Sequence, residues 1–526
     1  MLLSAPTEQP EQHAPARPRH GPRLVAVAAA IAAAATVVAW RTGDWWTGGF
    51  DGAAQNRTIA RALIFAAVFA AVLLARRVRA SRVALAVFAG WALYLGAWLV
   101  ALWPGIIMSD TADTVVNTRQ GIVYEWFSYV HSLLNLAVLD AVPNVAAFGV
   151  LQVLATAALM AYGSALVLRA GGRWWAVAAM NAVAALSAPL VVNTLLYSRD
   201  TLFGLAHVGL ALAVAEVVAV RRSVSRGGLI AIALLTGVLS VYRADGIVLA
   251  LVVPLLLLTL RPRRRAALLG AAAFAVSLAL FHVALPAICR IDPKVPGDYA
   301  LTLRLNPLGA VLNTDFYSRD PEADLAVLER VIDVDAVRAK ATPVEIPAYW
   351  EGDWNKAATP QDLAAFTATA DRLLRDNAGT VLGNRVATFG AASGLAEGGF
   401  TGTEMGSVRD RSAWLPDRAG MEGAPPSAGL YEAAAEPLRE SGSYRGLLSW
   451  RAALQWNLLP WLALLLGVAL AWRRLRFEAV VAAVVLCRVP LVFLAAPAAQ
   501  YKYYYSVLLA GLVVLGLLLA RLRRPA

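Results

Sequence analysis

Long apolar runs recur along most of this chain, and they constrain its fold more than any other feature of the sequence. A helix of about 20 apolar residues is long enough to cross roughly 30 Å of hydrocarbon. Hydrophobic residues make up 59% of the chain and charged residues only 16%, against roughly 25% charged in soluble domains. We therefore predict an all-α polytopic membrane protein.

The apolar runs predict about twelve transmembrane helices. They cover Leu24–Trp40, Ile59–Ala75, Val83–Trp103, Ala146–Leu168, Trp174–Val192, Leu202–Val220, Leu229–Val241, Ile247–Leu260, Ala266–Ile288, Trp456–Trp472, Phe477–Leu494 and Tyr503–Ala520. The seventh and eighth are each short enough to form a re-entrant hairpin instead of two crossings. Removing both leaves the orientation of every other span unchanged.

Arginine gathers in short islands between the spans, and these islands predict the topology. They lie at Arg76–Arg79, Arg221–Arg222, Arg261–Arg265, Arg473–Arg476 and Arg521–Arg524. Positive residues beside spans mark the cytoplasmic side, so both termini are expected in the cytoplasm of a multi-pass plasma-membrane protein. The net charge of +12 reflects these islands and not one basic recognition face, which argues against a nucleic-acid partner.

Four regions follow from this topology. Residues 1–23 are predicted to be a disordered cytoplasmic tail before a signal anchor, with a cleaved signal peptide as the alternative. Residues 24–288 form an N-terminal transmembrane block with an outer loop at 104–131, and residues 450–526 form a C-terminal block. Residues 289–449 form one large extracytoplasmic segment between the ninth and tenth spans. Only two cysteines are present, so no disulfide framework is implied.

The extracytoplasmic segment is too long to be a simple connection. Apolar periodicity predicts amphipathic helices over Asp320–Arg338 and Gln361–Asn377, and Pro360 is a helix-start signal before the second. Glycine and proline are dense between Gly390 and Gly429, which predicts a mobile loop or lid. No strand pattern is strong enough to predict a sheet.

Two acids lie where the third apolar run leaves the membrane, in the sequence Trp103 to Asp113. Asp110 and Asp113 are spaced so that they share one face of a helix, and each raises the pKa of the other. Such a pair suits proton transfer or a shared divalent cation. The alternative is structural, with Ser109 or Asp110 capping a short interfacial helix that runs to Arg119.

Other polar residues on the predicted outer face form a candidate binding set. His131 is expected to orient a phosphate or an acceptor, or to be an ordinary interfacial histidine. Arg199 and Asp200 precede the sixth span, where Asp200 is alternatively only its N-cap. Arg243 and Asp245 lie between the seventh and eighth spans and are expected to pair mainly with other loops.

Three further candidates come from the C-terminal block. Arg488 lies inside an apolar run, near its outer end, where a charge is costly unless it faces a polar cavity or a partner. With Lys502 it is expected to hold a lipid-linked phosphate, and the alternative for Arg488 is an interhelical ion pair. Tyr501 belongs to a tyrosine cluster that forms either a binding platform or, more commonly, an interfacial belt.

Four motifs together resemble the GT-C superfamily of polytopic membrane glycosyltransferases. They are Pro104-Gly105 followed by Ser109-Asp110-Thr111, with His131 after them; Tyr197 to Phe203 around Arg199-Asp200; Val241 to Gly246 around Arg243; and Gln500 to Tyr504. The acids here read Asp-x-x-Asp, whereas the family commonly has Asp-x-Asp, and His131 lacks the usual neighbouring proline. The resemblance extends over most of the membrane portion.

The resemblance implies a bacterial cell-envelope enzyme that moves a sugar from a polyprenyl-phosphate donor to a glycan, lipid or protein acceptor. Its active site is expected on the extracytoplasmic face, with Asp110 as general base in an inverting transfer. Asp113 is then expected to orient the acceptor or to bind a divalent cation. Arg243, Arg488, Lys502 or Arg199 would neutralise the departing phosphate.

Two other functions remain open from the sequence. A transporter or flippase of a lipid-linked glycan would use the same cavity, but it predicts charged residues along a path through the bilayer. A non-enzymatic cell-envelope assembly subunit would use the outer segment to bind wall polymers. The clustering of polar residues on one predicted side favours the enzyme.

Overall fold

The computed structural model describes residues 52–63, 82–107, 109–124, 128–142, 144–221, 225–260, 264–292, 298–344, 352, 354–355, 357–396, 427–442 and 449–522. At 109–113, 221, 264–266, 292, 298–300, 449 and 451 the description is limited to the backbone. The predicted tail, the first predicted span, most of the second and most of the glycine-rich stretch at 390–429 lie outside these residues.

Seven helical stretches in the described part are long and apolar enough to cross a membrane, so the chain is an all-α membrane protein. They are α3 (Arg82–Ala101), α6 (Ala146–Arg169), α9 with η2 (Arg199–Ala215, Glu216–Arg221), α12 with η4 and α13 (Arg264–Ala279, Leu280–Ala284, Leu285–Ile288), α23 with α24 (Ser449–Gln455, Leu459–Leu470), α25 with α26 (Arg476–Leu486, Val489–Ala495), and η6 with α27 (Tyr501–Tyr504, Tyr505–Arg521). The count of twelve spans stays a prediction.

The fifth predicted span is not one continuous helix, which corrects the expectation for Trp174–Val192. It is divided into α7 (Trp174–Ala185) and α8 (Ala188–Leu195), which meet at a bend of 67°. Pro189 lies in the first turn of α8 and has no amide hydrogen to donate to the carbonyl of Ala185. The hydroxyl of Tyr94 donates to that carbonyl oxygen instead, at 2.7 Å.

The seventh and eighth predicted spans are shorter apolar helices. They are α10 (Arg226–Tyr242) and, after the 3-10 turn η3 (Ala244–Val248), α11 (Leu249–Leu258). α10 packs against α9 and α12, and α11 packs against α10, α12 and α25. The break between α10 and η3 is therefore held inside the helix bundle, and it places Arg243 and Asp245 there.

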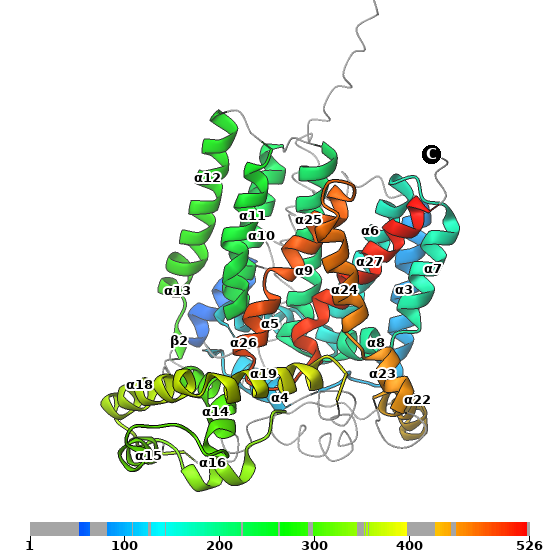
Figure 1. Cartoon of the computed structure of the whole chain (residues 1–526). Helices are drawn as coiled ribbons and strands as arrows, with labels where there is room; N and C mark the ends of the chain where they lie inside the picture. Colours follow the sequence, from blue (N-terminus) through cyan, green and yellow to red (C-terminus); the bar gives the residue numbers. More distant parts are fainter. Residues whose placement is uncertain are drawn as a thin grey trace, which may run out of the picture.

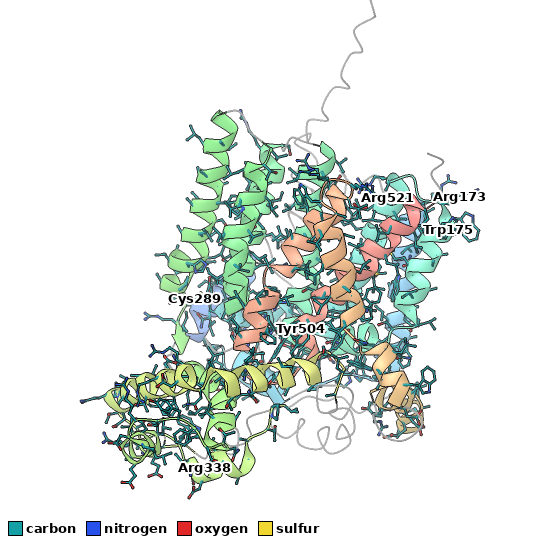
Figure 2. The ribbon with its side chains drawn as sticks, in the orientation of Figure 1. Arg173, Trp175, Cys289, Arg338, Tyr504 and Arg521 are labelled. Carbon is teal, nitrogen blue, oxygen red and sulfur yellow. The ribbon has the colours of Figure 1, made fainter. Side chains whose placement is uncertain are left out.

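The arginine-rich helix ends and the large polar segment lie at opposite ends of the bundle. In Figure 1, α12 begins and α27 ends at the upper end, whereas α14, α15, α16, α18 and α19 lie at the lower end. Figure 2 places Arg173 and Arg521 at the upper end and Arg338 at the lower end. This separation agrees with a positive-inside arrangement, while the side that each end faces stays a prediction.

The polar segment folds around its own apolar core, made by α14 (Asp298–Leu312), α15 (Pro321–Glu329), α16 (Val334–Lys340) and α18 (Pro360–Asp376). The single helix predicted over Asp320–Arg338 is wrong, because Asp320 and Asp333 each cap a separate helix. The helix predicted over Gln361–Asn377 is confirmed as α18. Its capping box joins Thr359 and Asp362, and Pro360 lies in its first turn.

Three elements connect the polar segment to the bundle. α19 (Ala378–Ala392) runs across the lower ends of the bundle helices, and α22 (Ala428–Ser441) packs against α3 and α8. A short parallel pairing, which the sequence did not predict, joins β1 (Val123–Tyr124) to β2 (Ile291–Asp292). The pairing fixes the outer loop after α3 against the start of the polar segment.

Candidate functional site

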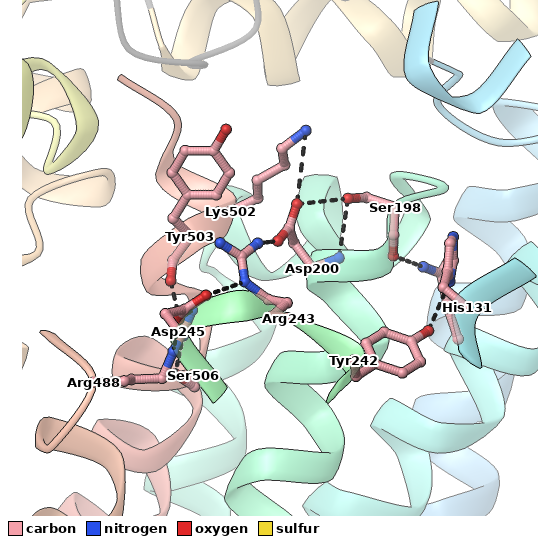
Figure 3. Close-up of polar contacts among 11 residues, drawn as sticks. His131, Ser198, Asp200, Tyr242, Arg243, Asp245, Arg488, Lys502, Tyr503 and Ser506 are labelled. Atoms are coloured by element: carbon pink, nitrogen blue, oxygen red, sulfur yellow. Dashed lines mark hydrogen bonds and ion pairs between the residues drawn. The ribbon is translucent and has the colours of Figure 1, made fainter. Parts of the chain in front are cut away.

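Five charged side chains from separate parts of the sequence form one continuous series of ion pairs (Figure 3). In spatial order they are Lys502, Asp200, Arg243, Asp245 and Arg488, and we call them the charge chain. Positive and negative groups alternate along it, and a cation lies at each end. All five were predicted as binding residues, and the structure brings them together.

The contacts along the charge chain are direct. Lys502 Nζ lies 3.8 Å from Asp200 Oδ2, and Arg243 Nη1 pairs with the other oxygen of Asp200. Arg243 Nε donates to Asp245 Oδ1 at 2.8 Å. Arg488 Nε donates to Asp245 Oδ2 at 2.5 Å. Arg243 thus bridges the two carboxylates. The two residues pair with each other and also, as expected, with other parts of the chain, Arg243 with Asp200 and Asp245 with Arg488.

The charge chain is almost closed to solvent. Its side chains are between 3% and 11% exposed. Buried charges are costly unless each has a partner, so the alternating order stabilises all five groups. Three cations face two carboxylates within the charge chain. Its net positive charge, in a water-poor setting, favours an anionic ligand such as a phosphate.

Aromatic rings and backbone groups fix the two arginines. The guanidinium of Arg243 lies 5.0 Å from the ring centre of Tyr503, and that of Arg488 lies 4.6 Å from the ring centre of Phe203. These distances allow cation–π attraction. Arg488 Nη1 also donates to the carbonyl oxygen of Tyr503 at 3.0 Å and to Ser506 Oγ at 3.4 Å. These contacts between protein groups hold the two arginines in place.

Every member of the charge chain lies at a helix end or a helix break. Asp200 is in the first turn of α9, Arg243 and Asp245 flank the start of η3, Arg488 precedes α26, and Lys502 lies in η6 before α27. Helix breaks leave backbone groups without intrahelical partners, and polar side chains satisfy them. The local sequence thus creates the polar positions, and packing then brings them into one site.

The N-cap of α9 is Ser198, which corrects the alternative that Asp200 is the cap. Ser198 Oγ accepts a hydrogen bond from the Asp200 amide at 3.1 Å. The same hydroxyl donates to Asp200 Oδ2 at 3.1 Å. The carboxylate of Asp200 also lies at the positive end of the helix dipole. Asp200 is therefore oriented by its own helix toward Arg243 and Lys502.

The predicted acid pair lies on α4 (Ser109–Arg119), which confirms a short helix that runs to Arg119. The side chains of Asp110 and Asp113 lie outside the described residues, so their roles stay predictions. Backbone pairing fixes the start of α4: the Ile106 amide donates to the Leu195 carbonyl, and the Tyr197 amide donates to the Ile106 carbonyl, both at 2.9 Å. Ser109, where α4 begins, is three residues after Ile106, and three residues span at most about 11 Å. The start of α4 therefore lies close to the start of α9.

His131, on α5 (Tyr129–Ala141), is buried beside the charge chain. Its Nδ1 lies 2.7 Å from the hydroxyl of Tyr242, the residue before Arg243. Burial is the main cause that lowers the pKa of His131 to about 3, and the positive charge of Arg199 is the second cause. His131 is therefore a neutral imidazole at pH 7. Arg199 is close enough to affect the titration of both His131 and Tyr242, so it lies on their side of the site.

Tyr501 does not belong to the charge chain. Its side chain is fully buried, and its ring contacts the ring of Trp456 with centres 5.1 Å apart. Tyr503, Tyr504 and Tyr505 are also buried, at 9%, 2% and 0% exposure. The expected interfacial belt is therefore wrong for this cluster, because its rings pack inside the bundle. Their rings pack against other side chains, whereas the ring of an interfacial tyrosine lies among lipid headgroups.

Several residues at the site were not predicted as functional. Ser506 lies one helical turn after Lys502 and accepts from Arg488. Gln152 Nε2 donates to the Leu196 carbonyl at 3.0 Å, beneath the start of α9. His207 is buried on α9, about two helical turns after Asp200, and its Nε2 lies 2.9 Å from the Val484 carbonyl oxygen. Each is a polar residue inside an apolar run, and that interruption was the available signal.

A divalent cation was left open by the sequence. In the part of the chain that the structure describes, no three His, Cys, Asp or Glu side chains are grouped as metal ligands. The side chains of Asp110 and Asp113, the two predicted oxygen ligands, lie outside the described residues.

Comparisons of the chain with protein-family models, with curated proteins and with solved structures find no match. We therefore infer the function from the motifs of the sequence and from the geometry of the charge chain. Two features of that geometry matter most. They are the terminal cations and the backbone pairing that fixes α4 beside α9.

Proposed function

We propose that this protein is a membrane glycosyltransferase that moves a sugar from a polyprenyl-phosphate donor to an acceptor on the extracytoplasmic face. The observation that supports it best is the charge chain, whose cations exceed its acids. It lies beside the start of α4, which bears Asp110 and Asp113. An anion-binding site next to a pair of acids suits the transfer of a group from phosphate to a hydroxyl.

The cations would stabilise the departing phosphate. Lys502 ends the charge chain, and Arg243 is held between two carboxylates and the ring of Tyr503. Because these groups are fixed before the donor binds, they stabilise developing negative charge with little reorganisation. Arg243 offers a planar fork and Lys502 a point charge, which together suit phosphate oxygens. A phosphate leaving group then needs little help from a general acid.

Asp110 would act as the general base. It removes the proton from the acceptor hydroxyl while that oxygen forms a bond to the anomeric carbon of the sugar. The bond from that carbon to the phosphate oxygen breaks on the opposite side, which inverts the anomeric configuration and releases polyprenyl phosphate. Asp113 would orient the acceptor or bind a divalent cation through oxygen. His131, neutral at pH 7, would hold Tyr242 beside Arg243.

The distribution of charge supports an enzyme over a transporter. At the other end of the bundle, Glu216 pairs with Arg169, and Glu478 pairs with Arg521. Between these pairs and the charge chain, the helices α9, α25 and α27 carry no Asp, Glu, Lys or Arg. A transporter would need polar groups along a path through the bilayer. Between the two ends, the one titratable side chain on the described parts of these three helices is the buried His207 of α9, which contacts the Val484 carbonyl.

The direct test is turnover of a panel of polyprenyl-phosphate sugars by the purified protein, with and without a chelator. Asp110→Asn should lower transfer by about 10²–10⁴-fold, the usual contribution of a general base, and should leave thermal unfolding unchanged. The matched control is Asp376→Asn at an exposed position on α18, which should transfer normally. Full activity in Asp110→Asn would reject the assignment. If the protein moves a lipid-linked glycan across the membrane in a way that needs Asp110, and transfers no sugar, the flippase would be favoured.

A further inference from the structure

An open groove of about 610 Å³ lies between α18, α19 and α26, away from the charge chain. Arg375 and Asp371 line it from α18, Arg385 and Leu382 line it from α19, and Leu494 lines it from α26. None of its lining residues belongs to the charge chain. The groove is therefore a second candidate site, and its chemistry can be considered separately.

The groove lies where the polar segment meets the helix bundle. α19 runs across the lower ends of the bundle helices (Figure 1). Arg385 Nη1 donates to the carbonyl oxygen of Ala496, just after α26, at 2.7 Å. The ring of Phe389 contacts the rings of Phe493 and Tyr504, with centres 5.9 and 5.5 Å apart. These contacts fix α19 against α26, so the groove between them is a preformed feature.

Two apolar strips beside the groove are uncovered. Leu382 and Val386, one turn apart on α19, are each 56% exposed. Leu491 and Leu494 on α26 are 37% and 62% exposed. The span Arg476–Ala495 ends with α26, so both strips lie at the boundary of the expected hydrocarbon layer. A helix with one exposed apolar face at that depth is typical of a segment that lies in the membrane interface.

Positive charge lies beside these strips. The carboxylate of Asp371 is held by Arg304, at 2.7 and 2.9 Å, so it is already neutralised. Arg375 is exposed, its Nε donates to the backbone carbonyl of Asp371 at 3.1 Å, and its charge also acts on the Asp371 carboxylate. Arg385 is 1% exposed, and its Nε has no hydrogen-bond partner in the described part of the chain. Arg375 at the rim can therefore donate to an anion, and the buried charge of Arg385 lies below it.

We propose that this groove binds an anionic glycerophospholipid of the bilayer. Its phosphate would lie against Arg375, and its two acyl chains would follow the apolar strips on α19 and α26. Charge complementarity selects an anionic headgroup, and two separate strips suit a lipid with two chains. The bound lipid would join the polar segment to the bundle at the membrane surface. This proposal does not depend on the proposed sugar transfer.

Native mass spectrometry of the full-length protein in detergent tests the proposal, with phosphatidylglycerol and phosphatidylcholine as probes. Wild type should retain phosphatidylglycerol about tenfold better than phosphatidylcholine, and Arg375→Gln should lose that preference. Arg375 is exposed, so the variant should fold. Arg319→Gln, an exposed arginine of the polar segment that does not line the groove, should keep the preference.

Three outcomes would overturn the proposal. They are equal retention of the two lipids by wild type, an unchanged preference in Arg375→Gln, and a groove that takes a polyprenyl phosphate while phosphatidylglycerol fails to compete. The last result would assign the groove to the donor lipid. Sugar transfer by Arg375→Gln at saturating donor should equal that of wild type, so failure of the lipid proposal and failure of the proposed enzyme activity remain distinguishable.

Discussion

Arg488 and Asp245 are 243 positions apart in the chain, and Nε and Nη2 of the arginine both face one carboxylate oxygen of the aspartate. Arg488 lies at the break between α25 and α26, whereas Asp245 lies at the break between α10 and α11. This pair joins the C-terminal helices to the N-terminal helices. It also ends the charge chain inside the bundle, where neither group can be hydrated freely.

Removal of one partner should therefore destabilise the protein strongly. Asp245→Ala leaves Arg488 buried beside an empty position, and we expect it to lower the free energy of unfolding by about 3–5 kcal/mol. The double variant Asp245→Leu, Arg488→Met should recover much of this loss, because it removes both charges. Thermal unfolding in detergent micelles measures the effect.

The matched control is an exposed ion pair in the polar segment. Glu432 pairs with Arg439, and its side chain is 52% exposed. Glu432→Ala should change the free energy of unfolding by about 1 kcal/mol or less, because solvent screens exposed pairs. Equal losses in Asp245→Ala and Glu432→Ala would show that the buried pair is no more important than a surface contact.

Lys502 should contribute to donor affinity. Lys502→Ala removes a terminal cation of the charge chain, and we expect the KM for a polyprenyl-phosphate sugar to rise about 10–100-fold, the usual loss for a hydrogen bond to a charged group. Lys502→Arg should retain most of the affinity, since the charge is kept. Lys340→Ala, at the end of α16, is the control. An unchanged KM in Lys502→Ala would remove this residue from the phosphate site.

His131 should make stability depend on pH. Its pKa in the folded protein is lowered to about 3, whereas an unfolded chain has the ordinary value of 6.5. Between these values the unfolded state binds more protons, so stability is complete above about pH 6.5 and decreases as the pH falls toward 3. At pH 5.5, which is one unit below the unfolded pKa, the free energy of unfolding should be about 1.4 kcal/mol lower than at neutral pH.

The variant His131→Gln isolates this effect, because glutamine does not titrate. Thermal unfolding of wild type and variant should be compared from pH 8 to pH 4.5 in the same detergent. The difference between the two should change with pH only below about 6.5. A constant difference over the whole range would show that His131 keeps a similar pKa in both states.

Cysteine labelling in intact cells should distinguish the two ends of the bundle. Arg173 and Arg338 lie at opposite ends of the molecule (Figure 2). After the two native cysteines are replaced, Arg338→Cys should react with a membrane-impermeant maleimide, whereas Arg173→Cys should react only after the membrane is permeabilised. Reaction of Arg173→Cys alone would invert the topology and place the charge chain toward the cytoplasm.

Much of the local structure could be predicted from the sequence. The apolar runs predicted the long helices, and Pro360 predicted the start of α18. Such features depend on a few neighbouring residues, or on whether a stretch prefers hydrocarbon to water. The bend at Pro189 and the division of α15 from α16 also had local signals, in a proline and two capping aspartates.

The sequence by itself determined which residues are polar where a membrane segment ends, and it singled out Asp200, Arg243, Asp245, Arg488 and Lys502 in that way. Only the tertiary structure decided that they pair with one another in alternating order, and that Tyr501 packs against Trp456 and not at the site. Hydropathy reports the surroundings of a segment, whereas ion pairing depends on which helix breaks meet. That is set by packing between helices that are hundreds of residues apart in the chain.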